Sequence, residues 1–325
     1  MRSVCKGLTP LAVVLTAACG NWSNEDVAFV EALPTSEHVH VALPNSAAQA
    51  AGAAPSSALT AACPAPGASQ VWGWAQPAGD GLNALVDGML VFVDYVRALT
   101  PTSRTSSGRT WGPFDDQNHP GKEEEVQMTR SVNADGLPEY SYVFGARVKG
   151  SGDPWTSILD GQFTGATARS GQGTFTLHFG ALRTLGLDDH PLTDPTGDLS
   201  AQYDRAQDPI TIGLDVGVNG SVAQFDYDYD GYANGNGSFS YKFVDANGDE
   251  FVVTASFDAA GEGKADVSVT LASLPNTAFS FSECWDANAC VTNVQDKYAG
   301  SLWAPDGISH LCAGGVCPSG PCPNL

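Results

Sequence analysis

Apolar and polar residues alternate along most of the chain beyond residue 120, which is the period of a β-strand with one buried face. The clearest example is residues 174–179, where Phe175, Leu177 and Phe179 alternate with polar side chains. Turn sequences such as Asn219-Gly220 separate the runs, so the connections are short and the strands pair antiparallel. The pattern predicts strands over residues 124–132, 139–149, 157–165, 173–179, 199–204, 209–217, 222–229, 237–244, 250–257, 265–271 and 278–284.

One segment has the helical period instead. Over residues 81–99, polar side chains fall on one narrow stripe and apolar ones occupy the rest of the surface. Asp80 is a candidate N-cap and Pro101 a stop signal. A helix this apolar must be buried, most simply against the concave side of a sheet. A second, brief helical turn is expected over residues 182–187, and a short helix capped by Ser23 over residues 22–33.

These elements predict a mainly β fold, either an antiparallel β-barrel or a strongly curved sheet of about 9–11 strands, with one buried N-terminal α-helix. The predicted organisation is a signal peptide (1–18), a lipidated flexible tether (19–70), a helix plus β-barrel domain (71–300) and a Cys-rich tail (301–325). The tether is inferred from residues 43–70, which are rich in Ala, Ser, Pro and Gly and nearly free of charge.

The first residues look like an export signal. Arg2 and Lys6 precede a short apolar run at residues 8–18, too short to span a bilayer. The run ends in Leu-Thr-Ala-Ala-Cys at residues 15–19, which resembles the lipobox of bacterial lipoproteins. That resemblance implies cleavage before Cys19, a diacylglycerol and further acyl groups on Cys19, and location in the cell envelope. The alternative is an ordinary secretory signal, with Cys19 a disulfide partner. Because Gly20 follows the cysteine instead of Asp, we expect the outer membrane, on its periplasmic or surface face.

The chain is strongly acidic, with 36 Asp and Glu against 15 Lys and Arg and a formal net charge of −21. Such a surface repels phosphate backbones, so nucleic acid is excluded as a partner. The expected partner is the membrane, through the lipid, with an unknown surface partner or a hydrophobic ligand besides.

One sequence run suggests a metal. Asp226, Asp228 and Asp230 alternate with tyrosines and precede Gly231, which is how a calcium-binding loop begins. The twelfth position of that loop should be Glu, but it is Gly237. The alternative is a strand with its tyrosines in the core and its aspartates in water. Ca²⁺ is therefore a possible ligand, and no other cofactor is predicted.

The cysteines predict disulfides. Cys5 leaves with the signal and Cys19 takes the lipid, which leaves an even set in an exported protein. Pairing between the two cysteines of residues 284–290 is one possibility, and zinc binding is the alternative to disulfides. The candidate disulfide residues are Cys63, Cys284, Cys290, Cys312, Cys317 and Cys322.

Further short motifs carry a second resemblance. Residues 111–114 (Trp-Gly-Pro-Phe), 139–142 (Glu-Tyr-Ser-Tyr) and 283–286 (Glu-Cys-Trp-Asp) resemble the bodies of uncharacterised outer-surface lipoproteins of delta-proteobacteria. This resemblance implies no reaction, and nucleophile motifs are absent from the sequence. We therefore expect a non-enzymatic, membrane-anchored structural or binding module. The alternatives are a carrier that holds a hydrophobic ligand in the barrel and a hydrolase without a recognisable motif.

Overall fold

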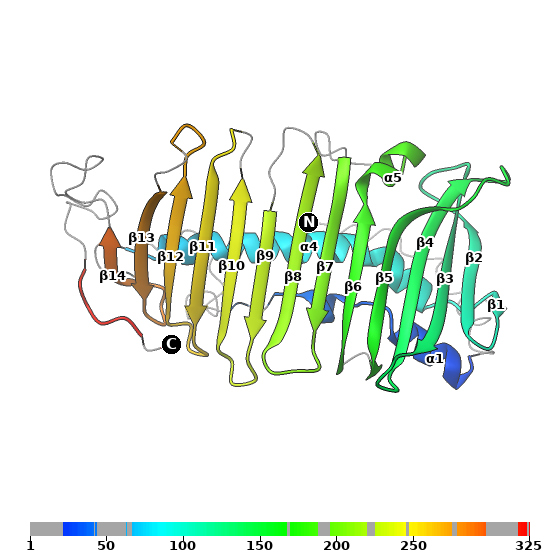
Figure 1. Cartoon of the computed structure of the whole chain (residues 1–325), viewed down its shortest axis with the longest axis horizontal. Coiled ribbons are helices and arrows are strands. Elements are labelled where there is room, and N and C mark those ends of the chain that lie inside the picture. Colours follow the sequence, from blue (N-terminus) through cyan, green and yellow to red (C-terminus); the bar gives the residue numbers. More distant parts are fainter. Residues whose placement is uncertain are drawn as a thin grey trace, which may run out of the picture.

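The computed structural model describes residues 22–41, 43, 63, 67–167, 170–187, 196–219, 225–244, 247–274, 278–296, 318–323 and 325. Its framework is one antiparallel sheet of fourteen strands, in which each strand pairs with its neighbours in the chain (Figure 1). The strands are β1 (Ser103–Arg104), β2 (Gly108–Asp115), β3 (Lys122–Val132), β4 (Pro138–Val148), β5 (Thr156–Thr167), β6 (Ser170–His178), β7 (Thr196–Asp204), β8 (Ile210–Asn219), β9 (Phe225–Gly231), β10 (Gly237–Val244), β11 (Glu250–Phe257), β12 (Gly263–Thr270), β13 (Ala278–Trp285) and β14 (Val291–Asp296).

The sheet is strongly curved and open, so the predicted barrel is wrong and the alternative of a curved sheet is confirmed, although the sheet has fourteen strands instead of the predicted nine to eleven. Closure would require the first and last strands to pair, but β1 and β14 lie at opposite ends of the strand order. Both edges are protected in another way. β1 is only two residues long, and residues 67–69 and 318–320 cover β14 with backbone hydrogen bonds.

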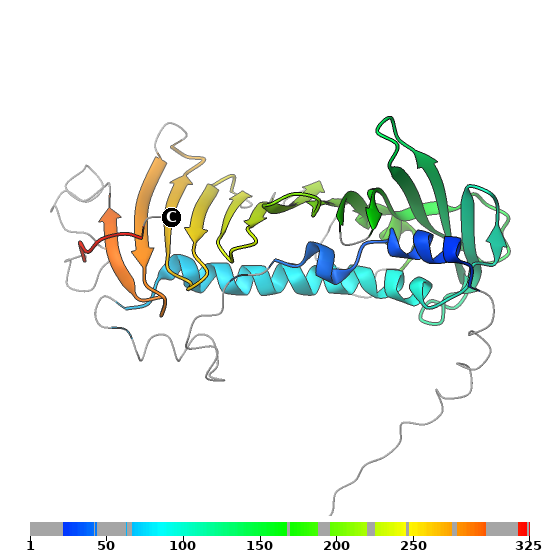
Figure 2. The ribbon, with the colours of Figure 1, turned by 90° about the horizontal axis from the view of Figure 1, so that it is seen from below.

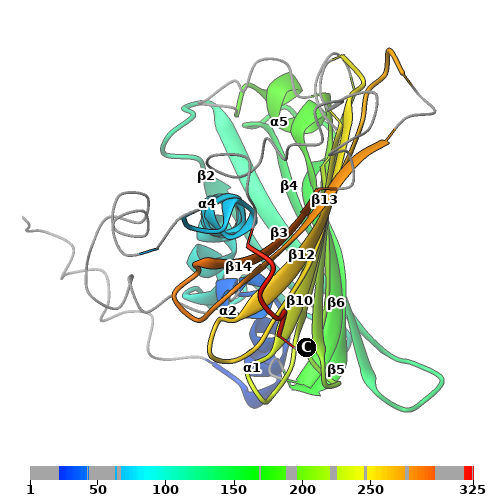
Figure 3. The ribbon, with the colours of Figure 1, turned by 90° about the vertical axis from the view of Figure 1, so that its left-hand side faces the viewer.

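A single long helix, α4 (Gln70–Arg97), runs along the sheet and crosses most of its strands (Figure 2). At 1.5 Å per residue its 28 residues span about 42 Å. Figure 3 shows this helix, with the shorter ones, on one side of the sheet, which we call the inner face. The predicted burial against the concave side of a sheet is therefore confirmed.

Helix α4 begins eleven residues before the predicted start at residue 81. Its N-cap is Ser69, whose hydroxyl accepts a hydrogen bond from the backbone N–H of Trp72, so Asp80 is not the cap. Glu283 of β13 accepts hydrogen bonds from the Ser69 hydroxyl and, at 2.8 Å, from the Val71 N–H. Partners from a strand over two hundred residues away complete this helix end, and the local sequence could not reveal them.

Two short helices extend the folded body toward the N-terminus. Helix α1 (Asn24–Glu31) has the predicted cap, since Ser23 and Asp26 form a reciprocal capping box. Helix α2 (Ser36–Val39) follows. Phe29 and Leu33 are buried against the sheet, so residues 24–41 of the predicted tether are part of the body. The tether prediction is wrong there because apolar side chains spaced along this segment join the core.

The core lies between the helices and the inner face. Helix α4 contributes Val86, Leu90, Val93 and Val96, each at most 1% exposed. Gly79 faces Leu43, which a Cβ on residue 79 would meet at 3.2 Å, so glycine permits the N-terminal segment to cross the helix closely. The predicted turn near residues 182–187 is helix α5 (Phe179–Leu185), whose apolar side chains also pack on this core.

Two disulfides join the segment before α4 and the C-terminal segment to the last strands. Cys63 pairs with Cys290, and Cys284 pairs with Cys322. The suggested Cys284–Cys290 pair is wrong, because each of these cysteines reaches a different distant segment. Cys19, Cys312 and Cys317 lie outside the described residues.

Candidate polar groove on the outer face

The face of the sheet turned away from helix α4, which we call the outer face, is polar. It results from strict alternation along the strands: in β7, Leu199, Ala201 and Tyr203 are buried on the inner face, while Gln202 is exposed on the other. None of the described helices covers the outer face (Figure 3). This broad polar surface is therefore accessible to a ligand.

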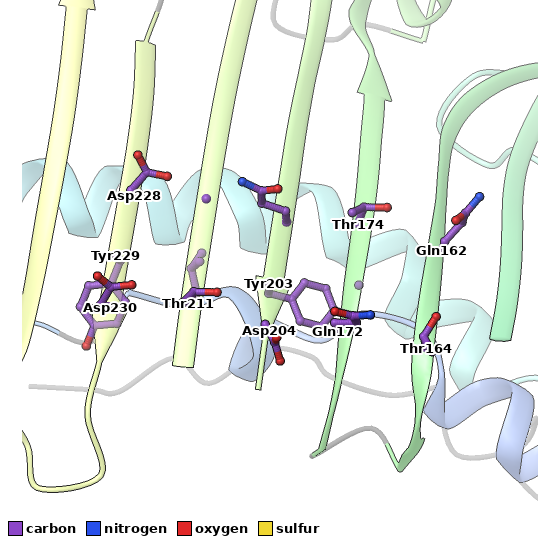
Figure 4. A pocket seen from close by; sticks show the side chains of 14 residues that line it. Gln162, Thr164, Gln172, Thr174, Tyr203, Asp204, Thr211, Asp228, Tyr229 and Asp230 are labelled. Carbon is purple, nitrogen blue, oxygen red and sulfur yellow. The ribbon is translucent and has the colours of Figure 1, made fainter. Parts of the chain in front are cut away.

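A groove crosses strands β5 to β9 on this face, with a cavity volume of about 300 Å³. Figure 4 shows its polar side chains in front of the strands, with helix α4 passing behind. The strand register arranges them in two rows across the sheet. One row is Thr164, Gln172, Asp204, Thr211 and Asp230, and the other is Gln162, Thr174, Gln202, Gly213 and Asp228.

The groove walls offer amides, hydroxyls and carboxylates. No Lys, Arg or His is among the lining residues. Asp230 accepts a hydrogen bond from Ser238, and Asp204 accepts bonds from the turn that follows it. Within the described part of the chain, Gln162, Gln172 and Asp228 have no side-chain hydrogen bond. Their polar groups therefore face solvent and are open to a ligand.

Gly213 opens the floor of the groove. It lies between Gln202 and Asp228 in the second row, and a Cβ there would meet the Gln202 amide nitrogen at 2.7 Å. Glycine lets the Gln202 side chain lie flat across the sheet. A larger residue would fill the gap between the two polar side chains.

A charged cluster lies beside the groove on the same face. The His178 imidazole bridges two carboxylates, with Nε2 2.7 Å from Asp160 and Nδ1 2.8 Å from Asp198. Partial burial opposes protonation, but the hydrogen bonds and charges of both aspartates outweigh it and raise the pKa of His178. Ser157 donates to Asp160 at 3.0 Å and does not contact the histidine, so the cluster is no Ser-His-Asp triad.

Strand β9 carries Asp226, Asp228 and Asp230, and Tyr227 and Tyr229 between them are buried. This agrees with the alternative interpretation, a strand with its tyrosines in the core. Side chains on one face of a strand repeat every two residues, about 7 Å apart, so these three do not converge as a calcium loop requires. Within the described ranges, no three His, Cys, Asp or Glu side chains are grouped to hold a metal ion.

Asp226 has a partner that the sequence did not predict. It lies directly opposite Asp215 of β8. Burial, the hydrogen bond to Asp226 and the charge of Asp226 all raise the pKa of Asp215. The two carboxyl groups therefore share a proton more readily than isolated aspartates do.

A second group of titratable side chains lies on and beside strands β2 and β3, away from the groove. Asp116 contacts His119 at 2.7 Å, and burial together with the Asp116 charge raises the pKa of Glu124 to about 7, although the His119 charge opposes this. Glu124 shares its strand face with Val126 and Met128, both buried in the core. It therefore lies on the inner face and cannot serve the groove.

The comparisons with known proteins give no identity: no family model, curated protein or solved structure matches this chain. The likeness to outer-surface lipoproteins and the lipid on Cys19 therefore stay predictions. No helix in the described part of the chain is both long and apolar enough to cross a membrane.

Proposed function

We propose that this protein is a lipid-anchored protein of the cell envelope that binds a neutral, extended glycan in the outer-face groove. The observation that carries the proposal is the double row of amide, hydroxyl and carboxylate side chains across β5 to β9. Such groups donate to and accept from sugar hydroxyls, and a rigid sheet presents them with little loss of conformational freedom.

The charge of the groove selects among hydrophilic ligands. Three aspartates and no basic residue line it, so an anionic polymer would meet repulsion without a compensating cation. A neutral sugar chain meets no such penalty. The spacing also fits, because adjacent strands lie about 4.8 Å apart, close to the length of one unit in an extended β-linked glycan. Each strand can therefore face one sugar unit.

The anchor is the other half of the proposal. A diacylglycerol on Cys19 would hold the protein at a membrane, since each buried methylene contributes about 0.8 kcal/mol. Labelling with radioactive palmitate tests it. We expect label on the wild type and none on Cys19→Ala, whereas equal labelling of both contradicts the anchor.

Glycan binding can be measured by isothermal titration of the full chain, in detergent micelles, with chitohexaose, cellohexaose and maltohexaose. The two extended β-linked oligosaccharides should bind and the coiled α-linked one should not. Replacing Gln172 and Gln202 by Ala removes two exposed amides, and we expect the affinity to fall roughly tenfold or more.

A matched control exists on the same face. Gln127 of β3 and Gln295 of β14 are exposed but lie outside the groove. Their double replacement by Ala should leave the affinity unchanged. Equal losses in the two double variants, or no binding of any oligosaccharide, would contradict the groove as the binding site.

The two alternative functions, a hydrophobic-ligand carrier and a hydrolase, would need different structural features. A carrier needs a cavity on the inner face, but the buried valines and Leu90 of helix α4 pack there against the sheet. A hydrolase is favoured only by the proton-sharing pair Asp215–Asp226 beside the groove. Shorter oligosaccharides appearing during the titration would assign hydrolysis instead of binding.

A further inference from the structure

The second row of the groove continues beyond the groove in both directions. After Asp228 on β9, the strand register adds one side chain on each remaining strand: Ser240, Thr254, Asp266, Ser282 and Gln295. On the other side of Gln162, it adds Ser141 on β4 and Thr129 on β3. The row therefore crosses every strand from β3 to β14, and we call it the long row.

The long row is polar and accessible along its whole length. Every member except Gly213 is exposed or half-exposed. Its charged members are Asp228 and Asp266, and it holds no Lys, Arg or His that would attract an anionic ligand. Outside the groove it adds hydroxyl, amide and carboxylate groups, as inside the groove. The extension therefore offers a sugar chain the same kinds of hydrogen bond.

The rows on either side of the long row are interrupted. The first row of the groove reaches Lys264 on β12 and then Cys284 on β13, which is buried and bonded to Cys322. The row on the opposite side contains Val143 on β4 and Val252 on β11. Of these three rows, only the long row crosses from β3 to β14 without a basic or an apolar side chain.

The long row is longer than a hexasaccharide. At about 4.8 Å between neighbouring strands, its steps from β3 to β14 span about 53 Å. A hexasaccharide with one unit on each strand covers the groove strands β5 to β9 and one more. It therefore does not reach Thr254 on β11 or Gln295 on β14, and only a longer chain can contact them.

We infer that the groove is the central part of a track for a long glycan, and that the protein binds the interior of a single polymer chain along the long row. This inference rests on the proposed function, because it requires a sugar chain in the groove. The long row continues from both ends of the groove, so the bound polymer needs no free end there. The outer face is the convex side of the sheet, since α4 lies against the concave side (Figure 3). A single hydrated chain can bend slightly to follow it.

The length of the ligand tests the track. Long-chain glycol chitin, which is soluble and neutral, and a hexasaccharide cut from it are titrated into the full chain in detergent micelles. The distal variant, Thr254→Ala with Gln295→Ala, removes two exposed members of the long row outside the groove. We expect its affinity for the polymer to fall roughly fivefold or more, and its affinity for the hexasaccharide to equal that of the wild type. Comparing variant with wild type on one polymer cancels the larger number of positions that a polymer offers.

A matched control lies on neighbouring strands. Ser268→Ala with Ser280→Ala changes two half-exposed side chains of the interrupted row, about 7 Å along the strands from the long row. This variant should bind both ligands as the wild type does. Equal polymer affinities of the distal variant and the wild type, or an equal loss in the control variant, would overturn the track while hexasaccharide binding stands. Failure of the wild type to bind the hexasaccharide would instead contradict the proposed function, so the two failures are distinguishable.

Discussion

Asp26 is the residue on which the attachment of α1 depends. Its carboxylate is fully buried between Arg104 and Arg109, and Nε of Arg109 lies 2.5 Å from one oxygen. Although burial opposes ionisation, the Ser23 N–H and both arginines lower the pKa of Asp26 to about 2. The ion pair therefore persists at any physiological pH.

Removing one partner of this pair should be costly. Asp26→Ala removes the buried partner of Arg109, and we expect the free energy of unfolding to fall by about 3 kcal/mol or more. Glu25→Ala removes only the exposed partner of Arg109, and should cost less than about 1 kcal/mol. Urea denaturation of both variants measures the difference, and similar costs would contradict the buried pair.

His178 should make stability depend on pH. Since its folded pKa is raised by Asp160 and Asp198, its contribution is complete below the unfolded pKa of about 6.5 and is lost as the pH rises through the folded pKa. The wild type should therefore lose stability relative to His178→Gln as the pH rises above about 6.5. Denaturation of both proteins over a pH series tests this, and parallel pH dependences would count against the cluster.

At the scale of elements, α4 is the support of the sheet. Leu90 is completely buried between the helix and the strands, while Val91, one residue along, is 66% exposed. We expect Leu90→Ala to cost about 2–5 kcal/mol and Val91→Ala to stay within about 0.5 kcal/mol of the wild type. Thermal or chemical unfolding of both variants measures the two costs. Equal costs would mean that the helix does not pack on the sheet as described.

The spacing of apolar residues along the chain was enough to predict most of the helices and strands. Strands β10 and β11 begin and end at the predicted residues, and the others differ by a few residues at their ends. β2 was missed because Gly112 and Pro113 interrupt it at a bulge. β14 was missed because its partly buried sequence, Val-Thr-Asn-Val-Gln-Asp, lacks a clean alternation. The first turns of α4 were missed because Gly73, Pro77 and Gly79 are typical of a loop.

At the scale of the molecule, the sequence predicted the antiparallel pairing and eleven of the fourteen strands, but not whether the sheet closes. Whether a sheet closes depends on the stagger and tilt accumulated over all strands, which no local pattern encodes. The groove was invisible for a related reason. Its glutamines and threonines are ordinary outward-facing residues, and only the register of three neighbouring strands, β5 to β7, brings Gln162, Gln172 and Gln202 together.

The resulting picture is a long, open sheet with two different faces. The inner face is filled by α4 and the shorter helices, so it supplies stability. The outer face is polar and uncovered by the described helices, so it is the surface available to a ligand.

The side-chain amide signals of glutamine test the proposed binding site most directly. In a nuclear magnetic resonance titration of the deuterated chain with chitohexaose, the amide groups of Gln162, Gln172 and Gln202 should shift together and saturate with one dissociation constant. The amide groups of Gln127 and Gln295, exposed on the same face outside the groove, should not move. Unchanged groove signals at saturating sugar, or equal shifts at all five glutamines, would contradict glycan binding in the groove.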